Sequence, residues 1–254
     1  LILALTVVVW RARAALGPAS AFAWAALAWV LVQGVFGKYT VTLKLYPAVV
    51  TAHLLGGMVL LGLLMAQLEV MRQAPRVLAA RGAGWVLALV AVQIALGGWV
   101  SSNYAVLACR GFPQCNGQWW PSADYTAGFT LLRQLGRAGS EGYVSFEALV
   151  AIHMAHRLVA ALVMVAVLVL AWRLWRDRGE AARRAAAMLV ALLVLQLLSG
   201  LSNVLLDWPM LAALLHTTGA AGFVALLVVL VMRARSQRVA APAAIEGPLR
   251  RRHA

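Results

Sequence analysis

The chain has 254 residues, of which 63% are hydrophobic and 12% charged, and its formal net charge at pH 7 is +14. A soluble domain of this length has too little interior to bury so much apolar surface, so the composition excludes that class and indicates a membrane protein. The positive charge would suit a nucleic-acid-binding protein, but it is concentrated in alternate loops between apolar segments. This distribution indicates orientation in a membrane, and no nucleic acid partner is expected.

Seven apolar segments follow one another along the chain. The first, residues 1–10, is too short to cross a bilayer, and Arg11 and Arg13 after it resemble the end of a span. The six longer segments reach or approach the roughly 20 residues that a spanning helix needs. They lie at 20–37, 47–68, 84–101, 148–172, 186–206 and 209–232. The sequence therefore predicts an all-α polytopic membrane protein.

The short first segment has a counterpart further along the chain. It ends at Trp10 and Arg11, and the fourth of the longer segments ends at Trp172 and Arg173, 162 positions later. Leu1 lies inside an apolar run with no charged residue before it, which argues against a signal peptide. We therefore expect that the first helix and part of the second helix are missing from this chain. A short interfacial helix at a genuine N-terminus is the alternative.

Basic residues are distributed unevenly over the loops between these segments. One set of alternate loops, together with the residues after the last segment, carries sixteen of them: Arg11, Arg13, Arg72, Arg76, Arg81, Arg173, Arg176, Arg178, Arg183, Arg184, Arg233, Arg235, Arg238, Arg250, Arg251 and Arg252. The opposite set carries five: Lys38, Lys44, Arg110, Arg133 and Arg137. Because cytoplasmic loops carry the excess of Lys and Arg, this predicts a multi-pass protein of a bacterial inner membrane with the arginine-rich loops in the cytoplasm. Residues 241–254 would form a basic cytoplasmic tail, which either touches anionic lipid headgroups or serves as a simple anchor.

One pattern occurs twice in the chain. The first copy consists of Gln33, Gly37, Val41, Pro47, His53 and Gly56. The second consists of Gln196, Gly200, Val204, Pro209, His216 and Gly219. The offset is 163 positions, except at the proline, where it is 162. In both copies an apolar helix ends, a turn containing proline follows, and a second apolar helix carries one histidine. A duplicated helix pair with one buried imidazole per copy predicts two equivalent ligand sites, one in each half.

The long loop at residues 101–147 contains both cysteines. Cys109 and Cys115 enclose five residues, and the predicted orientation places them on the periplasmic side, where the compartment is oxidising. This spacing favours a small disulfide ring. Two free thiols are the alternative, and a metal site is disfavoured because no other ligand type clusters there.

Four histidines lie within the predicted spans: His53, His153, His156 and His216. Buried polar groups are costly in lipid, so each needs a partner, and a hydrogen bond between helices is the simplest interpretation of any one of them. His156 and His216 both lie about seven residues from the outer ends of their segments, or roughly 10 Å at 1.5 Å per residue. Two imidazoles at one depth can approach both faces of a flat macrocycle, which predicts bis-histidine ligation of heme iron. His53 lies at the same depth in the first half and is predicted to bind iron there.

Two other kinds of site fit less well. Structural zinc needs four nitrogen or sulfur ligands, and each half of the chain offers too few. A proton relay would normally include buried carboxylates, and the spans contain almost none, with Glu69 near a cytoplasmic end and Asp207 in an outer turn.

Two neighbours of His156 are further candidates for binding the cofactor. His153 lies three residues earlier on nearly the same helix face and is predicted to hydrogen-bond a heme propionate or to orient the ligand. A histidine facing headgroups at a helix end is the alternative. Arg157 lies inside a span and needs an anion, for which a heme propionate is suitable. Pairing with a backbone carbonyl or snorkelling is the alternative for Arg157.

The pattern Gln-x-x-x-Gly occurs three times, beginning at Gln33, Gln93 and Gln196. Its glycines allow close helix contact or leave room for the edge of a planar cofactor, and its glutamines can hydrogen-bond across helices. Packing is the simpler interpretation.

Together these features resemble the heme A synthase family. The resemblance covers residues 1–232 and rests on four segments: QGVFGKYTVTLKLYPAVVTAHLLGG, GGWVSSNYAVLACRGFPQC, IHMAHR and QLLSGLSNVLLDWPMLAALLH. It implies eight helices in two pseudo-symmetric four-helix halves, so that residues 1–75 would be the N-terminal half and 76–240 the C-terminal half. It also implies the family's activity, which oxidises a methyl group of heme O to the formyl group of heme A for terminal oxidases.

The resemblance assigns roles to individual residues. It implies that His156 and His216 ligate a resident heme b, and that His53 belongs to the half that receives heme O. Cys109 and Cys115 match the outer-loop cysteine pair of the family.

The family's catalytic glutamate belongs to a Glu-x-x-His-Arg motif that would precede Leu1, so the catalytic residue of this chain is unknown. The stretch from His153 to Arg157 is the apparent counterpart of that motif, with histidine in place of glutamate.

We therefore expect a heme A synthase that uses heme b as its cofactor and heme O as its substrate. The alternative is a bis-histidine membrane cytochrome that transfers electrons or handles heme without oxygenase activity. The expected partners are heme O, heme O synthase, an unidentified electron donor and membrane lipid, with a homo-oligomer left open.

Overall fold

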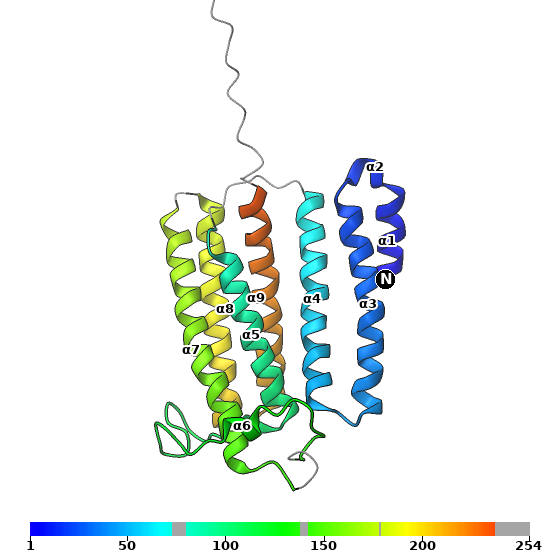
Figure 1. Cartoon of the computed structure of the whole chain (residues 1–254). Helices are drawn as coiled ribbons and strands as arrows, with labels where there is room; N and C mark the ends of the chain where they lie inside the picture. Colours follow the sequence, from blue (N-terminus) through cyan, green and yellow to red (C-terminus); the bar gives the residue numbers. More distant parts are fainter. Residues whose placement is uncertain (73–79, 138–141, 178, 237–254) are drawn as a thin grey trace, which may run out of the picture.

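The computed structural model describes residues 1–72, 80–137, 142–177 and 179–236 (Figure 1). Its helices are α1 (Ile2–Arg11), α2 (Arg13–Leu16), α3 (Ala19–Thr42), α4 (Pro47–Arg72), α5 (Ala83–Ser102), α6 (Tyr125–Gly128), α7 (Phe146–Arg176), α8 (Glu180–Leu205) and α9 (Met210–Ser236), with the short 3-10 helix η1 (Ala105–Leu107). The predicted domain boundary between 75 and 76 and the predicted basic tail at 241–254 lie outside the described residues, so both stay predictions.

The six predicted spans are confirmed as six long apolar helices, α3, α4, α5, α7, α8 and α9. Residues 1–10 correspond to the short apolar helix α1. Several helices extend beyond the predicted segments, most of all α3, which continues to Thr42, and α8, which begins at Glu180. Polar residues continue a helix when no proline or glycine interrupts it, and here Gly179 stands just before α8. The protein is therefore an all-α, multi-pass membrane protein, as predicted.

Four of the long helices form a bundle, which we call the C-terminal bundle. Within it α5 packs on α7, α7 on α8, α8 on α9, and α9 on α5. This order makes α7 and α9 diagonal to each other. On the other side α4 packs against both α5 and α9, α3 packs against α4, and α1 packs against α3, so these helices extend the structure sideways (Figure 1).

The two ends of the helices differ in character. One end carries α6 and the long loop and is called the loop end (Figure 1). The opposite end carries Arg72, Arg173, Arg184 and Arg233 near helix termini and is called the arginine-rich end. This difference is the one that the loop composition predicts.

An apolar core fills the arginine-rich part of the C-terminal bundle. Its fully buried side chains include Val167, Leu189 and Leu227, one from each of three helices. A second apolar cluster, containing Trp99 and Ile152, closes the bundle at the loop end. The predicted histidine ligands belong to neither cluster. They form a polar layer between the two.

An ion pair joins the two sides of the structure near the arginine-rich end. Arg233 of α9 donates from Nε to Glu69 Oε2 of α4 at 2.8 Å and from Nη2 to Oε1 at 3.1 Å. The Glu69 side chain is only 4% exposed, whereas that of Arg233 is 26% exposed. A bidentate guanidinium–carboxylate pair of this kind fixes both the distance and the relative rotation of two helices.

Candidate functional site

Three histidines each lie against a glycine of a neighbouring helix. An added Cβ on Gly37 of α3 would lie 3.3 Å from Cε1 of His53, on α4. The same atom added to Gly97 of α5 would lie 3.2 Å from His156, on α7, and on Gly200 of α8 it would lie 3.1 Å from His216, on α9. These distances are tighter than ordinary side-chain contacts, so any larger residue would push the imidazole aside. The glycines of the repeated Gln-x-x-x-Gly pattern therefore make room for the imidazole rings.

The glutamines of the same pattern hold the histidine backbones. Gln33 Nε2 donates to the carbonyl of His53 at 2.8 Å, and Gln196 Nε2 donates to the carbonyl of His216 at 2.8 Å. Gln93 Nε2 donates to the carbonyl of His156 at 3.2 Å. The sequence suggested that these glutamines could bond across helices, and all three do so.

The first and third copies share one further feature. The glycine three residues after the histidine, Gly56 or Gly219, has the glutamine amide directly where a Cβ would stand. In the α7 copy the corresponding residue is Val159. In these two copies the glutamine reaches the histidine carbonyl through the space that a side chain at Gly56 or Gly219 would fill.

The three histidines lie at one depth from the loop end. Gly37, Gly97 and Gly200 each stand five residues before the last residue of their helices, which end at Thr42, Ser102 and Leu205. Five residues correspond to about 7.5 Å along a helix. Because each imidazole touches its glycine, the three rings share this depth.

Counting from the starts of the histidine helices would not have shown this common depth. The helix α7 begins at Phe146, ten residues before His156, whereas α9 begins at Met210, six residues before His216. These two counts differ because α7 extends further into the loop end than the sequence indicates. The prediction of equal depth is supported instead by the positions of Gly37, Gly97 and Gly200 in α3, α5 and α8.

His156 and His216 lie on the two diagonal helices of the C-terminal bundle. Each leans on a different neighbour, His156 on α5 and His216 on α8. The structure thus brings the two predicted ligands of one iron to one depth within one bundle.

Ser199 fixes the orientation of His216. Its hydroxyl donates to the carbonyl of Leu195 at 2.6 Å, and Ser199 Oγ lies 3.0 Å from Nδ1 of His216. Because the hydroxyl proton is used at Leu195, the serine oxygen accepts from the Nδ1–H of the imidazole. This tautomer leaves the lone pair of Nε2 for a metal. Ser199 is not among the predicted site residues, and its position directly before Gly200 is the signal that could have identified it.

His53 has no such partner. Its Nδ1 is buried without a hydrogen-bond partner among the described residues. The residue that corresponds to Ser199 in the first copy is Phe36, which cannot accept a hydrogen bond.

The surroundings of His156 differ again. The amide nitrogen of Gln93 lies 3.0 Å from Nδ1 and 3.2 Å from Nε2 of the ring. Binding of a metal at Nε2 of His156 therefore requires the Gln93 amide to move away from the imidazole. The Oε1 atom of Gln93 is buried without a partner among the described residues, so the amide is held through its nitrogen alone.

The predicted disulfide is confirmed, since Cys109 and Cys115 are bonded with an S–S distance of 2.03 Å. Arg157 holds the loop around it. Its guanidinium donates to the carbonyls of Cys109 at 3.1 Å, Gly111 at 2.9 Å and Gln114 at 3.2 Å. Arg157 therefore pairs with backbone carbonyls, which was the alternative expected from the sequence. Binding of a heme propionate by Arg157 stays a prediction. The residue next to His156 thus ties the disulfide loop to α7.

His153 faces the loop end. It is 4% exposed, and its Nδ1 lies 3.0 Å from the carbonyl of Ala105 in η1. The side chain therefore fixes the loop against α7, and a contact of His153 with a propionate stays a prediction.

A buried arginine near the loop end was also missed. Arg133 is 3% exposed and donates to Asn103 Oδ1 at 2.7 Å, beside the ring of Trp99. Burial lowers the pKa of the Arg133 guanidinium because it disfavours the charged form. The sequence identified Arg133 only as a charged loop residue. In the structure Arg133 packs with Asn103 and Trp99 at the loop end of the bundle.

The fold and the site define a polytopic helical membrane protein with imidazoles at one depth, two of them on diagonal helices of one bundle. The chain belongs to the cytochrome oxidase assembly protein family (COX15-CtaA), which it matches over residues 1–231.

Three similar proteins carry the name heme A synthase. The one from Shewanella oneidensis is 39% identical over 201 residues, which is 76% of this chain and 60% of that protein. The one from Methylobacterium radiotolerans is 34% identical over 63% of this chain and 41% of its own length. The one from Maricaulis maris is 30% identical over 53% of this chain and 36% of its own length. The matched part of the chain thus spans between about one third and three fifths of these relatives, and the resemblance to the heme A synthase family is confirmed.

Proposed function

We propose that this protein acts as a heme A synthase of a bacterial inner membrane, oxidising a methyl group of heme O to the formyl group of heme A. The proposal rests on family membership and on relatives named for that activity. The single structural observation that carries it is the layer of three imidazoles at one depth, each seated on a glycine and held through its backbone by a glutamine. A duplicated imidazole site suits an enzyme that handles two hemes, one resident and one as substrate.

The residues of the C-terminal bundle fit a resident heme b. Gly97 and Gly200 leave room for the imidazoles of His156 and His216. A larger side chain at either glycine would displace the imidazole. Ser199 selects the tautomer in which Nε2 of His216 can bind iron. Imidazole nitrogen is a common ligand of heme iron, and a ligating histidine usually donates its other ring N–H to a neighbouring group, as His216 does to Ser199. When bound, heme b would supply electron transfer to the substrate site.

The remaining roles belong to the protein's own groups. His216 would be held in one orientation by Ser199, and Gln93 would release the ring of His156 so that its nitrogen can bind. The apolar clusters on both sides of the histidine layer would exclude water from it. In the other half His53 would receive the substrate heme O. We propose that the loop end, with the disulfide, faces the periplasm, because the arginines gather at the opposite end.

Expression of the chain with heme O synthase in a host that makes no heme A tests the activity. Extraction of hemes and their mass measurement should detect heme A only when this protein is present. His216→Ala should abolish heme A in the same host, and His253→Ala, in the predicted basic tail, is the matched control. Absence of heme A when this chain and heme O synthase are expressed together would contradict the proposal.

Absorbance spectra of the purified protein separate the alternatives. Low-spin heme b without any heme A in the cells would favour the electron-transfer cytochrome. A colourless, well-folded protein would contradict both.

A further inference from the structure

The disulfide is part of a short hairpin that leads into a pair of tryptophans. The backbones of Cys115 and Gln118 exchange two hydrogen bonds, at 2.9 and 3.0 Å. Residues 116 and 117, an Asn-Gly pair, form the turn between them, and their φ angles of 54° and 79° are both positive, as a type I′ turn requires. Gln118 therefore lies beside the disulfide, and Trp119 and Trp120 follow it directly.

This hairpin is held firmly against α7. Cys109 and Cys115 are buried and pack with Val150 and Met154 of α7. Arg157, on the same face of α7, donates to three backbone carbonyls of the loop. The hairpin therefore has a fixed depth relative to the spanning helices.

The contact with α7 places the hairpin at the level where the spanning helices end. His156 of α7 lies against Gly97, which stands five residues before the last residue of α5, Ser102. At 1.5 Å per residue, Met154 is then about 4.5 Å inside the end of α5, and Val150 is about 1.5 Å outside it. Hydrocarbon gives way to headgroups near the ends of spanning helices, so the hairpin lies at the depth of that boundary.

Three large aromatic side chains of this loop are exposed at that depth. Phe112 is 64% exposed, Trp119 67% and Trp120 76%. No Lys, Arg, Asp or Glu occurs from residue 111 to residue 123, so no charge in this stretch favours water. Aromatic rings, and those of tryptophan above all, are enriched where hydrocarbon meets water, because an apolar body and a polar edge suit both sides.

The hairpin lies on the outer edge of the C-terminal bundle. Among the long helices α7 packs against α5 and α8, and its outward face continues below the hairpin with the exposed side chains of Leu158, Leu162 and Val165. Figure 1 shows the loop extending sideways beside α7, on the side opposite to α1. The repeat would place a first-half counterpart of α5 beside α4 and α9, away from this side of α7.

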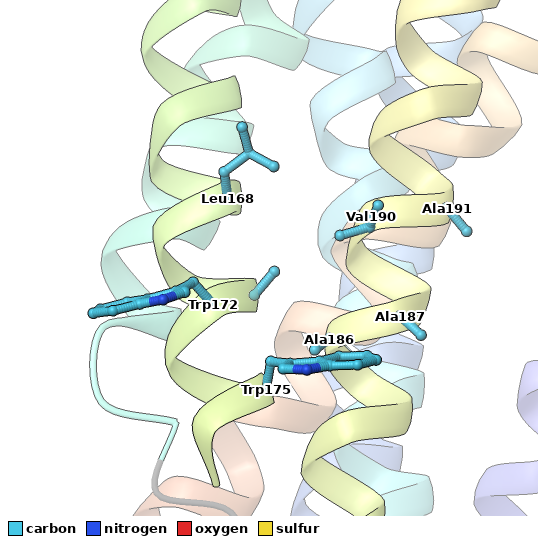
Figure 2. A pocket seen from close by; sticks show the side chains of 8 residues that line it. Leu168, Trp172, Trp175, Ala186, Ala187, Val190 and Ala191 are labelled. Carbon is cyan, nitrogen blue, oxygen red and sulfur yellow. The ribbon is translucent and has the colours of Figure 1, made fainter.

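Tryptophans also lie at the other end of α7. Trp172 and Trp175 are exposed there, and Figure 2 shows Trp172 extending outward and Trp175 extending toward Ala186 of α8. Val150 and Trp172 are twenty-two residues apart, or about 33 Å along the helix. The hydrocarbon core of a bilayer is about 30 Å thick, so the aromatic groups at the two ends of α7 match its two surfaces.

From this arrangement we propose that Phe112, Trp119 and Trp120 insert into the headgroup region of the leaflet at the loop end, so that the disulfide hairpin is a lipid-binding surface. The hairpin would thereby hold the loop end of α7, and with it His156, at one depth in the bilayer. The inference does not depend on the proposed enzymatic activity.

Site-directed spin labelling of the full chain in vesicles of phosphatidylethanolamine and phosphatidylglycerol tests this surface. Because Cys109 and Cys115 are bonded to each other, Trp120→Cys supplies a single reactive thiol. Collisions of the label with oxygen, which concentrates in lipid, and with a nickel chelate, which stays in water, report its depth. The ratio of oxygen to nickel collisions should be lower than at Leu162→Cys on the lipid-facing part of α7. It should be clearly higher than at Tyr143→Cys, the matched control, which is exposed at the loop end before α7 begins.

A fluorescence measurement tests the same surface without an added cysteine. Trp119→Phe with Trp120→Phe removes two emitting groups and keeps both positions aromatic. In the wild-type protein, the emission that this change removes should be quenched by brominated acyl chains and protected from iodide in the water. Trp99→Phe is the control, because Trp99 is buried and the emission that it contributes should be quenched by neither reagent.

Three results would overturn the proposal. Equal collision ratios at positions 120 and 143, or quenching of the tryptophan pair by iodide in place of brominated lipid, would show that the hairpin lies in water. Spectral broadening between labels at position 120 that disappears on dilution with unlabelled protein would show that a second copy covers the aromatic side chains. Elution of each variant at the wild-type volume in size-exclusion chromatography excludes loss of the fold as the cause.

Discussion

The His53 unit of α3 and α4 and the His216 unit of α8 and α9 have the same backbone contacts but different imidazole environments. In each, a glutamine donates to the histidine carbonyl at 2.8 Å and a glycine lies against the ring. Ser199 then holds Nδ1 of His216, whereas Phe36 stands at the corresponding position and Nδ1 of His53 is buried without a partner among the described residues. The repeat thus preserves where an imidazole lies, and one neighbouring side chain decides how firmly it points.

This difference accords with the proposed division of labour. A permanently bound cofactor benefits from a ligand that is fixed in one tautomer, because the orientation is then set before binding. A substrate that must enter and leave is served by a ring that can still turn. Four experiments can break or sharpen the comparison between the two units.

The largest effect is expected from removal of the histidines. His216→Ala should reduce heme b in the purified protein to less than about a tenth, because loss of a ligand costs more than the roughly 10–100-fold that loss of its hydrogen-bond partner costs. His53→Ala should keep heme b and lose heme A formation. Heme per protein is measured from the pyridine hemochrome spectrum, and equal loss of heme b in both variants would contradict the assignment of different roles.

Filling the glycine sites should have the next largest effect. Gly200→Val places carbon atoms where the imidazole of His216 lies and should weaken heme b binding about thirtyfold, since overpacking of this kind costs about 1–3 kcal/mol. Gly37→Val should spare heme b and affect only the His53 unit. Gly34→Val is the matched control on α3, because nothing lies within 4 Å of a Cβ at that position. A heme b titration of each variant measures the outcome, and an equal effect of the Gly34 and Gly200 variants would argue against the glycine seat.

The serine should have a smaller effect. Ser199→Ala removes the acceptor for Nδ1–H of His216 and should weaken heme b binding about tenfold and alter its midpoint potential. Phe36→Ser supplies the missing acceptor to His53 and should leave heme b unchanged. Redox titration of the bound heme checks both variants, and a wild-type potential in Ser199→Ala would show that the hydrogen bond does not orient the ligand.

The smallest effect is expected from the glutamines. Gln33→Leu and Gln196→Leu each remove one hydrogen bond between helices, from the glutamine amide to a histidine carbonyl. Each should lower the free energy of unfolding by only about 0.6 kcal/mol, because the carbonyl still lies within a helix. The two values should agree because both bonds are 2.8 Å long. Thermal unfolding of the detergent-purified protein measures them. A clear difference between the two variants would show that the units differ in more than the residue at positions 36 and 199.

Sequence patterns predicted much of the fold and part of the site. Length and hydropathy predicted the six spans, because a bilayer accepts only long apolar helices. The cysteine spacing predicted the disulfide, and the repeat identified His53 and His216 as equivalent. The role of Ser199 and the burial of Arg133 were not predicted, since each depends on a contact between residues far apart in the chain or on different helices.

Arg157 illustrates the same limit. The sequence shows a charge inside a span that needs partners, but it does not distinguish a propionate from backbone carbonyls. In the structure the guanidinium lies within reach of three carbonyls of the disulfide loop, which is forty-odd residues earlier in the chain. Only the path of that loop over α7 brings them together.

By itself, the sequence determined the six spans, the duplication and the candidate histidines, because hydrophobic length and internal repetition are properties of the chain read in order. Only the tertiary structure decided that each imidazole lies against a glycine of a neighbouring helix, that Ser199 orients one of them, and that Arg157 holds the disulfide loop. The physical reason is that hydrogen bonds and charge clusters depend on distances between helices, which are set by packing and not by the order of residues along any one of them.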